Sequence, residues 1–181
     1  MTVQRPYGLP TEAKAQLEVL LTHRDPMILL DEVLALDEVH AVSRVVVQTT
    51  SRFFRDDLGG VPSWVGLEYM AQTIALWGSD QLLLQGKPVA IGFLLGSRCY
   101  DTSARLFTPG MRLLTEIKPS YLEESGLSSF DCTIRLEQPD GAGQVLATAA
   151  VNAFRPERHE EFVAASLRNA NHQSTEQDQG E

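Results

Sequence analysis

The chain has 181 residues, of which 43% are hydrophobic and 22% charged, and these values are typical of one globular domain with a sizeable core. Its formal net charge of −9 argues against nucleic acid as a main partner, because phosphates would be repelled, although it leaves room for a local basic patch. The two cysteines, Cys99 and Cys132, form no metal-ligand pattern, so we expect two reduced core thiols and no metal site.

No signal-peptide pattern is found at the N-terminus, and no apolar run approaches the roughly 20 residues that span a bilayer. We therefore expect a soluble, cytoplasmic protein without a membrane span. The composition predicts three regions: a loose N-terminal arm over residues 1–10, a folded domain over 11–155, and a polar, disordered tail over 156–181.

The first predicted elements are a short helix and two strands. The helix covers Glu12–Leu21, with Thr11 as its N-terminal cap. Segments rich in Ile, Leu and Val predict strands at Met27–Leu36 and Ala41–Thr49, joined by a hairpin turn. The polar, glycine-rich loop SRFFRDDLGG follows them.

A long helix is predicted from Ser63 to Leu84, where Gly86 and Pro88 end it. Turn signals then separate four more predicted strands, at Val89–Tyr100, Met111–Leu122, Ser128–Glu137 and Gln144–Phe154. The segment EFVAASL in the tail predicts one further small helix. The fold class is therefore α+β, with an antiparallel sheet and one long central helix.

The central helix is apolar around most of its circumference, which predicts that the sheet wraps it. Glu68, Gln72 and Ser79 nevertheless share one side, and Ala71 and Ala75 keep that side shallow, as in the wall of a cleft or an interface. A buried carboxylic acid that keeps its proton can serve as a general acid near neutral pH. The alternative is that Glu68 only hydrogen-bonds a neighbouring element or favours the helix dipole.

Two motifs resemble those of hotdog-fold 3-hydroxyacyl-acyl-carrier-protein dehydratases. LTHRDPMILLDEV at Leu21–Val33 resembles their opening motif, and VPSWVGLEYMAQ at Val61–Gln72 resembles their central helix. Phe93–Gly96 and Phe107–Met111 match two later signatures. The resemblance covers Ala15–Phe154 and is strongest to the ApeP-like branch, the dehydratases of aryl polyene lipid synthesis. It implies the hotdog fold, a curved antiparallel sheet wrapped around one long helix, and a dimer with active sites between subunits.

The resemblance also implies a reaction. A 3-hydroxyacyl chain on the phosphopantetheine arm of an acyl carrier protein loses water and becomes the trans-2-enoyl thioester, without a metal or other cofactor. Glu68 stands at the position of the family acid that protonates the departing hydroxyl. The backbone N–H groups of Ser63, which replaces a family glycine, and Trp64 would polarise the thioester carbonyl. Gln72 would orient the Glu68 carboxyl.

Aromatic residues near this helix are candidates for lining an acyl or aryl tunnel. They are Trp64, Tyr69, Phe53 and Phe54. Aromatic side chains at such positions also serve as core or dimer contacts, and the sequence leaves both interpretations open.

The general base is the point at which this sequence departs from the family. The usual dehydratases carry a histidine in an HFP motif before the acid, whereas Phe53–Asp56 contains none. Of the four histidines, only His23 lies within a family motif; His40 is in the predicted hairpin turn, and His159 and His172 are in the tail. Three hypotheses follow: His23 is the base; Asp56, Asp57 or a partner's histidine is the base; or the chain is a largely inactive, substrate-holding subunit.

An acyl carrier protein is acidic, so its docking to an acidic enzyme requires a local positive patch. We expect Arg98, Arg105 and Arg112 to form it at the tunnel mouth, the alternative being scattered, solvated arginines. Two function classes remain open, a dehydratase and a catalytically weak hotdog subunit that completes a heterodimer with an active one; a homodimer is also compatible. Thioester hydrolysis is a third, weaker alternative.

Overall fold

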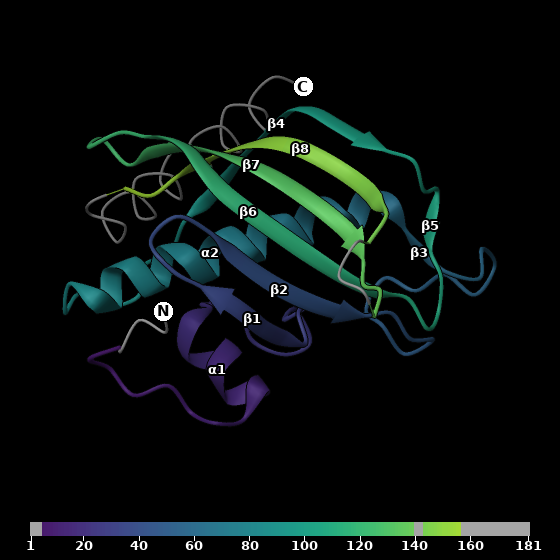
Figure 1. Cartoon of the computed structure of the whole chain (residues 1–181), viewed down its shortest axis with the longest axis horizontal. Coiled ribbons are helices and arrows are strands. Elements are labelled where there is room, and N and C mark those ends of the chain that lie inside the picture. Colours follow the sequence, from purple (N-terminus) through teal and green to yellow (C-terminus); the bar gives the residue numbers. More distant parts are fainter. Residues whose placement is uncertain (1–4, 140–142, 157–181) are drawn as a thin grey trace, which may run out of the picture.

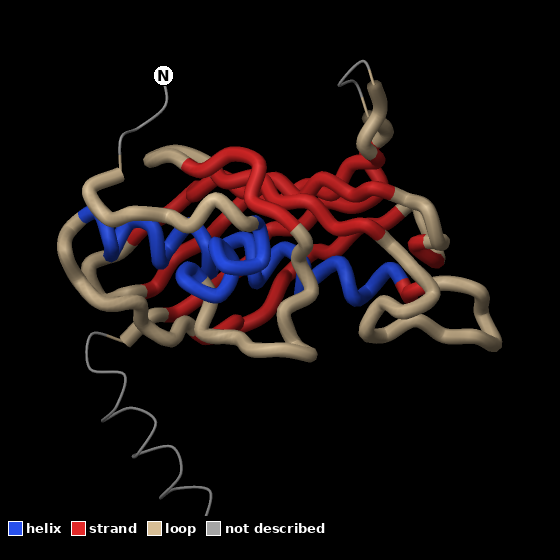
Figure 2. The backbone as a smooth tube through the Cα atoms, turned by 90° about the horizontal axis from the view of Figure 1, so that it is seen from below, coloured by secondary structure: helices blue, strands red, loops and turns tan. Residues whose placement is uncertain are grey.

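The computed structural model describes residues 5–139 and 143–156. A six-stranded antiparallel sheet curves around the long helix α2 (Gly66–Leu84), as Figures 1 and 2 show from two directions. The strands, in their order across the sheet, are β1 (Glu32–Leu36), β2 (Ala41–Val46), β6 (Arg112–Leu122), β7 (Leu127–Leu136), β8 (Val145–Phe154) and β4 (Phe93–Thr102). This is the α+β arrangement that the sequence predicts.

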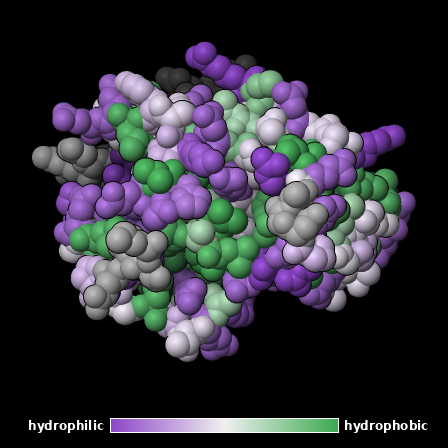
Figure 3. Space-filling model, viewed as in Figure 1, coloured by the Kyte–Doolittle hydropathy of each residue, from purple (hydrophilic) through white to green (hydrophobic). Residues whose placement is uncertain are grey.

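The core lies between α2 and the concave face of the sheet. Alternate residues of each strand point to one face, so Leu113 and Ile117 of β6 and Phe130 and Ile134 of β7 are buried. From the helix side, Met70 and other apolar residues of α2 complete this core. The outer face of the sheet, seen in Figure 3, mixes hydrophilic and apolar side chains.

The start of the long helix is more elaborate than predicted. A single 3₁₀ turn, Ser63–Val65, precedes α2, and before it β3 (Val61–Pro62) pairs with β5 (Leu106–Phe107). Two-residue strands carry no measurable periodicity, so the sequence did not reveal this small second sheet.

Most predicted strands are confirmed within a few residues, but the strand predicted at Met27–Leu36 is wrong in its first half. Only Glu32–Leu36 belongs to the sheet. The preceding residues run along α2, because the backbone of Met27 and Leu29 bonds to the side chain of Gln72. An apolar segment held by a helix side chain has the same composition as a strand, so composition alone did not distinguish them.

Helix α1 (Ala13–Leu20) lies beside β1 and buries Leu17 and Leu20 (Figure 1). The predicted cap by Thr11 is wrong: Glu12 occupies the cap position, and no side chain caps the helix. Ahead of it, Arg5 and Tyr7 bond to the fully buried Asp80 of α2, so this part of the predicted loose arm is attached to the domain. The predicted tail helix, His159 and His172 lie outside the described residues.

The two cysteines differ in their surroundings. Cys132 of β7 is buried, as expected, whereas Cys99 is exposed. The core position expected for Cys99 is wrong because β4 is the last strand of the sheet and buries few of its side chains. Within the described residues, no helix is long and apolar enough to cross a membrane.

Candidate active site

Glu68 of α2 and His23, which follows α1, line the same cavity, whose volume is about 430 Å³. The distance between His23 Nε2 and Glu68 Oε1 is 3.7 Å. About a third of each side chain is exposed, so the buried environment expected for Glu68 is not present in the single chain. The structure therefore places a carboxyl and an imidazole beside each other in the lining of a cavity that a small reacting group could enter.

The Gln72 side chain bonds both to Glu68 and to the segment that follows His23. Its side chain is fully buried, and its Nε2 donates to Glu68 Oε1 at 2.9 Å and to the Met27 carbonyl at 2.8 Å. The Leu29 N–H donates to its Oε1 at 3.0 Å. The expected bond to Glu68 is thus present, and the same amide also fixes the segment that follows His23, which the sequence did not show.

The other nitrogen of His23 is not held in this way. Its Nδ1 is buried and has no hydrogen-bond partner in the described part of the chain. A histidine that acts as a base usually has its second nitrogen oriented by an acceptor, which fixes the tautomer. His23 therefore lies beside Glu68 but lacks, among the described residues, the acceptor that usually orients such a ring.

The two backbone N–H groups predicted to polarise the thioester carbonyl differ in whether they are already hydrogen-bonded. The Ser63 N–H donates to the Arg105 carbonyl at 3.1 Å, which continues the pairing of β3 with β5, so this group is not free. For the Trp64 N–H, the described residues provide no acceptor. Of the predicted pair, only the Trp64 N–H is available to a ligand.

Tyr100 of β4 fixes the direction of that free N–H. Its hydroxyl donates to the Ser63 carbonyl, which belongs to the same peptide group as the Trp64 N–H. Burial raises the pKa of Tyr100 to about 12, so the hydroxyl keeps its proton at neutral pH. Gly66 permits the contact, because a Cβ there would lie 2.5 Å from the Tyr100 hydroxyl. The sequence pattern did not single out Tyr100.

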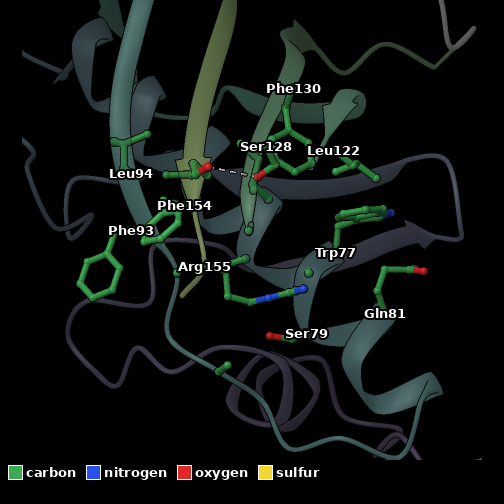
Figure 4. A pocket seen from close by; sticks show the side chains of 18 of the residues that line it. Trp77, Ser79, Gln81, Phe93, Leu94, Leu122, Ser128, Phe130, Phe154 and Arg155 are labelled. Carbon is green, nitrogen blue, oxygen red and sulfur yellow. Dashed lines mark hydrogen bonds between the residues drawn. The ribbon is translucent and has the colours of Figure 1, made fainter. Parts of the chain in front are cut away.

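The aromatic residues predicted to line a tunnel do not line this cavity. Tyr69 is buried against Phe107, Phe54 packs on the core, and the largely exposed Trp64 contacts Phe53. The cavity is instead lined by aromatic side chains from α2 and from one end of the sheet, shown in Figure 4: Trp77, Phe93, Phe130 and Phe154. They are scattered along the sequence, and only the sheet topology brings them together.

The acids proposed as alternative bases lie elsewhere. Asp57 pairs with Arg55 at 2.8 Å, and this guanidinium holds the pKa of Asp57 below its ordinary value. Asp56 is exposed, and neither acid lines the cavity. The other described histidine, His40, pairs with Asp37 in the turn between β1 and β2.

The three predicted docking arginines also lie outside the cavity lining. The charge of Arg112 is compensated by Glu137. Glu137 also pairs with Arg44. Arg98 and Arg105 make no ion pair with any described residue. No group of three or more His, Cys, Asp or Glu side chains within residues 5–139 and 143–156 is arranged to hold a metal ion.

A curved antiparallel sheet around one helix, with an acid on that helix facing a cavity, defines a hotdog-fold protein. The family model of ApeP dehydratases matches residues 15–164, and the chain belongs to this ApeP-like family. A comparison with curated protein sequences gives no match.

Solved structures agree with the fold. The dehydratase heterocomplex ApeI:P from Xenorhabdus doucetiae has a chain with 27% identity and a TM-score of 0.72, over 82% of this chain and 96% of that one. The phenylacetic acid degradation protein PaaI from Escherichia coli has 12% identity and a TM-score of 0.52, over 68% and 78% of the two chains. PaaI from Thermus thermophilus has 18% identity and a TM-score of 0.51, over 68% of this chain and 91% of that one. The two PaaI proteins show similarity of fold alone.

Proposed function

We propose that this protein dehydrates a 3-hydroxyacyl thioester carried by an acyl carrier protein, in aryl polyene or fatty-acid-like synthesis. The observation that carries the proposal is the Glu68–His23 pair, which faces a largely apolar cavity in a member of a dehydratase family. The phosphopantetheine arm belongs to the substrate, and the proposal requires no metal or other cofactor.

The reaction needs one base and one acid. The base removes a proton from C2, the electron pair of that bond forms the C2=C3 double bond, and the C3 hydroxyl takes a proton from Glu68 and leaves as water. Negative charge develops on the thioester oxygen as the C2 proton departs, and the Trp64 N–H is the group that would stabilise it. The product is the trans-2-enoyl thioester.

His23 is the proposed base, because its Nε2 lies beside Glu68 in the lining of the cavity. One observation favours the alternative, a base supplied by a second subunit: Nδ1 of His23 has no partner among the described residues, so nothing there orients the ring. In that alternative this chain contributes the acid, is catalytically weak alone, and completes a heterodimer.

The outer edge of β4 is the proposed subunit interface. β4 is the last strand of the sheet, and its Leu94 and Leu95 are exposed. Phe93 and Leu94 also line the cavity, so a partner on this edge would enclose the site. The similar chain belongs to the dehydratase heterocomplex ApeI:P, which supports a second hotdog subunit as the partner. A homodimer would use the same edge.

Docking of the carrier protein is proposed to involve Arg98 and Arg105, whose charges no described residue neutralises. Arg112 is expected to contribute less, because Glu137 compensates it. Binding that weakens as salt concentration rises would support this patch.

The test measures enoyl thioester formation from a 3-hydroxyacyl carrier protein, by the chain alone and after mixing with an ApeI subunit. Glu68→Gln should abolish turnover in both cases. If His23 is the base, His23→Ala should do the same; unchanged turnover by His23→Ala in the mixture would assign the base to the partner. Release of free carrier-protein thiol would instead indicate a thioesterase and contradict the proposal.

A further inference from the structure

We propose that Tyr100 of β4 is a positioning residue for the dehydration: its hydroxyl both aims the Trp64 N–H and makes it a stronger donor to the thioester oxygen. This inference rests on the proposed function, because it assigns a role within the same site. Trp64 precedes Glu68 by four residues, about 6 Å along a helix, so its N–H and the acid can act on the carbonyl and the C3 hydroxyl of one substrate.

The peptide group between Ser63 and Trp64 is held from two directions. Its carbonyl oxygen accepts from the Tyr100 hydroxyl and also from the N–H of Gly66, the first residue of α2. The preceding peptide group is fixed as well, because the Ser63 N–H donates to the Arg105 carbonyl at 3.1 Å. Since a peptide group is planar and trans, fixing its carbonyl oxygen also fixes the opposite direction of its N–H. The Trp64 N–H is therefore presented to a ligand in one orientation.

The Tyr100 hydroxyl can act toward this carbonyl only as a donor. A carbonyl oxygen has no proton to give, and the hydroxyl makes no other hydrogen bond with the described residues. Burial raises the pKa of Tyr100 to about 12, so the proton stays on the phenol throughout the neutral range. The donated bond is thus kept under the conditions in which a dehydratase would work.

A donor on the carbonyl oxygen strengthens the N–H of the same peptide group. It draws electrons toward the oxygen, which increases the double-bond character of the C–N bond and leaves the N–H more positive. Such cooperativity strengthens a neighbouring hydrogen bond by roughly 10–30%. The gain is larger in the transition state than in the bound substrate, because negative charge develops on the thioester oxygen as the C2 proton departs. Tyr100 is therefore expected to affect turnover more than substrate binding.

The packing around Gly66 leaves room for this hydroxyl. A Cβ at that position would lie 2.5 Å from the Tyr100 hydroxyl, 2.8 Å from Ile134 Cδ1 and 3.3 Å from Phe107 Cε2. The Tyr100 hydroxyl thus reaches a space between the sheet and the first turn of α2 that only a residue without a side chain keeps open. The contact with the Ser63 carbonyl depends on this space.

The first readout of the experiment is the infrared stretching frequency of a bound thioester carbonyl. The probe is hexanoyl-pantetheine, isotope-labelled at that carbonyl, which lacks a 3-hydroxyl group and cannot be dehydrated. The protein is the full chain with an ApeI subunit. In the wild type we expect a lower frequency than in the free probe, because the Trp64 N–H donates to the oxygen.

Two variants change the donor strength of residue 100 in opposite directions. Tyr100→Phe should move the carbonyl frequency at least halfway back toward that of the free probe. Tyr100→fluorotyrosine, with the fluorine next to the hydroxyl, is a stronger donor and should lower the frequency further. A residue that serves only in packing would not produce this opposite pair of shifts.

The second readout separates turnover from binding. With a 3-hydroxyacyl carrier protein, Tyr100→Phe should lower kcat about tenfold and leave KM within about twofold of the wild type. Tyr121→Phe is the matched control, because it removes the same hydroxyl from an exposed tyrosine of β6 that makes no hydrogen bond with the described residues. It should match the wild type in both readouts.

The inference is overturned if the wild-type bound carbonyl absorbs at the frequency of the free probe, or if the two Tyr100 variants do not shift it in opposite directions. An active protein whose kcat is unchanged by Tyr100→Phe would overturn it as well. A protein that shows both frequency shifts but does not dehydrate the substrate would contradict only the proposed function.

Discussion

Gln72 is the residue on which the geometry of the candidate site depends most directly. One buried amide bonds to the Glu68 carboxyl and to the backbone on both sides of Ile28, so it sets how far the segment after His23 stands from α2. Its position one turn after Glu68 was visible in the sequence. Its bonds to Met27 and Leu29 were not, because they connect residues more than 40 positions apart.

Gln72→Leu should lower the free energy of unfolding by about 2–4 kcal/mol, because it leaves a buried backbone donor and acceptor unpaired. Turnover at saturating substrate should fall at least tenfold, since Glu68 and His23 lose their common support. Chemical denaturation and steady-state kinetics measure the two effects. Gln16→Leu, which removes one bond to the Pro10 carbonyl, is the control and should cost about 1 kcal/mol without affecting turnover.

The Cys132 thiol makes the free energy of unfolding depend on pH in the alkaline range. Burial raises the pKa of its thiol to about 12, so the folded chain holds this proton more tightly than the unfolded chain does. The resulting stability is fully present below the unfolded pKa, near 9, and is lost as pH rises toward 12.

Between pH 9.5 and 11, Cys132→Ala should therefore lose stability less steeply than the wild type, by about 1.4 kcal/mol per pH unit at most. Urea denaturation at several pH values measures the slope. Cys99→Ala is the control, because that thiol is exposed and its removal should change the slope much less. Identical slopes for Cys132→Ala and the wild type would show that the thiol is not protected from ionisation.

At the scale of elements, the start of α2 is where strand β4 and the helix meet. Gly66 allows Tyr100 to reach the Ser63 carbonyl, and this contact orients the peptide group that presents the Trp64 N–H. The apolar, long helix was predictable from its composition and its stop signals. The close packing at its first turn was not predictable, because a glycine in a helix does not indicate which side chain will contact it.

Gly66→Ala should destabilise the protein by about 1–3 kcal/mol, because the new methyl group would lie 2.8 Å from Ile134 Cδ1 and closer still to the Tyr100 hydroxyl. Gly78→Ala is the matched control within the same helix. Its nearest neighbour would be Arg155 Nη1 at 3.9 Å, an ordinary contact, so the higher helix propensity of alanine should leave stability unchanged or raise it. Thermal and urea denaturation of the two variants provide the comparison.

Sequence patterns at this scale predicted elements better than they predicted neighbours. The strands β6, β7 and β8 can be recognised from the sequence, because apolar and polar residues alternate along a half-buried strand. The cavity combines one side of α2 with the ends of four strands, β4, β6, β7 and β8, and with Arg155, and only the order of strands in the sheet determines that combination. For the same reason Trp77 and Phe130, rather than Tyr69, line the cavity.

For the whole molecule, the exposed edge of β4 should determine association. Leu95→Lys places a charge on this edge, where the cost of desolvating it would oppose pairing with a second sheet. Size-exclusion chromatography with light scattering should show a shift from dimer to monomer, in homodimers or in mixtures with an ApeI subunit. Val39→Lys, in the exposed turn between β1 and β2, is the control and should associate like the wild type. An unchanged dimer in Leu95→Lys would show that the interface lies elsewhere.

The opposite edge of the sheet is built differently. β1 is a five-residue strand, and α1 lies beside it. Short or covered edge strands are poor templates for further pairing, whereas β4 has ten residues. A sheet with one receptive edge can recruit one partner, after which no growing end remains. The asymmetry of the two edges thus makes assembly self-limiting, and closed pairs rather than extended filaments are the expected outcome even at high concentration.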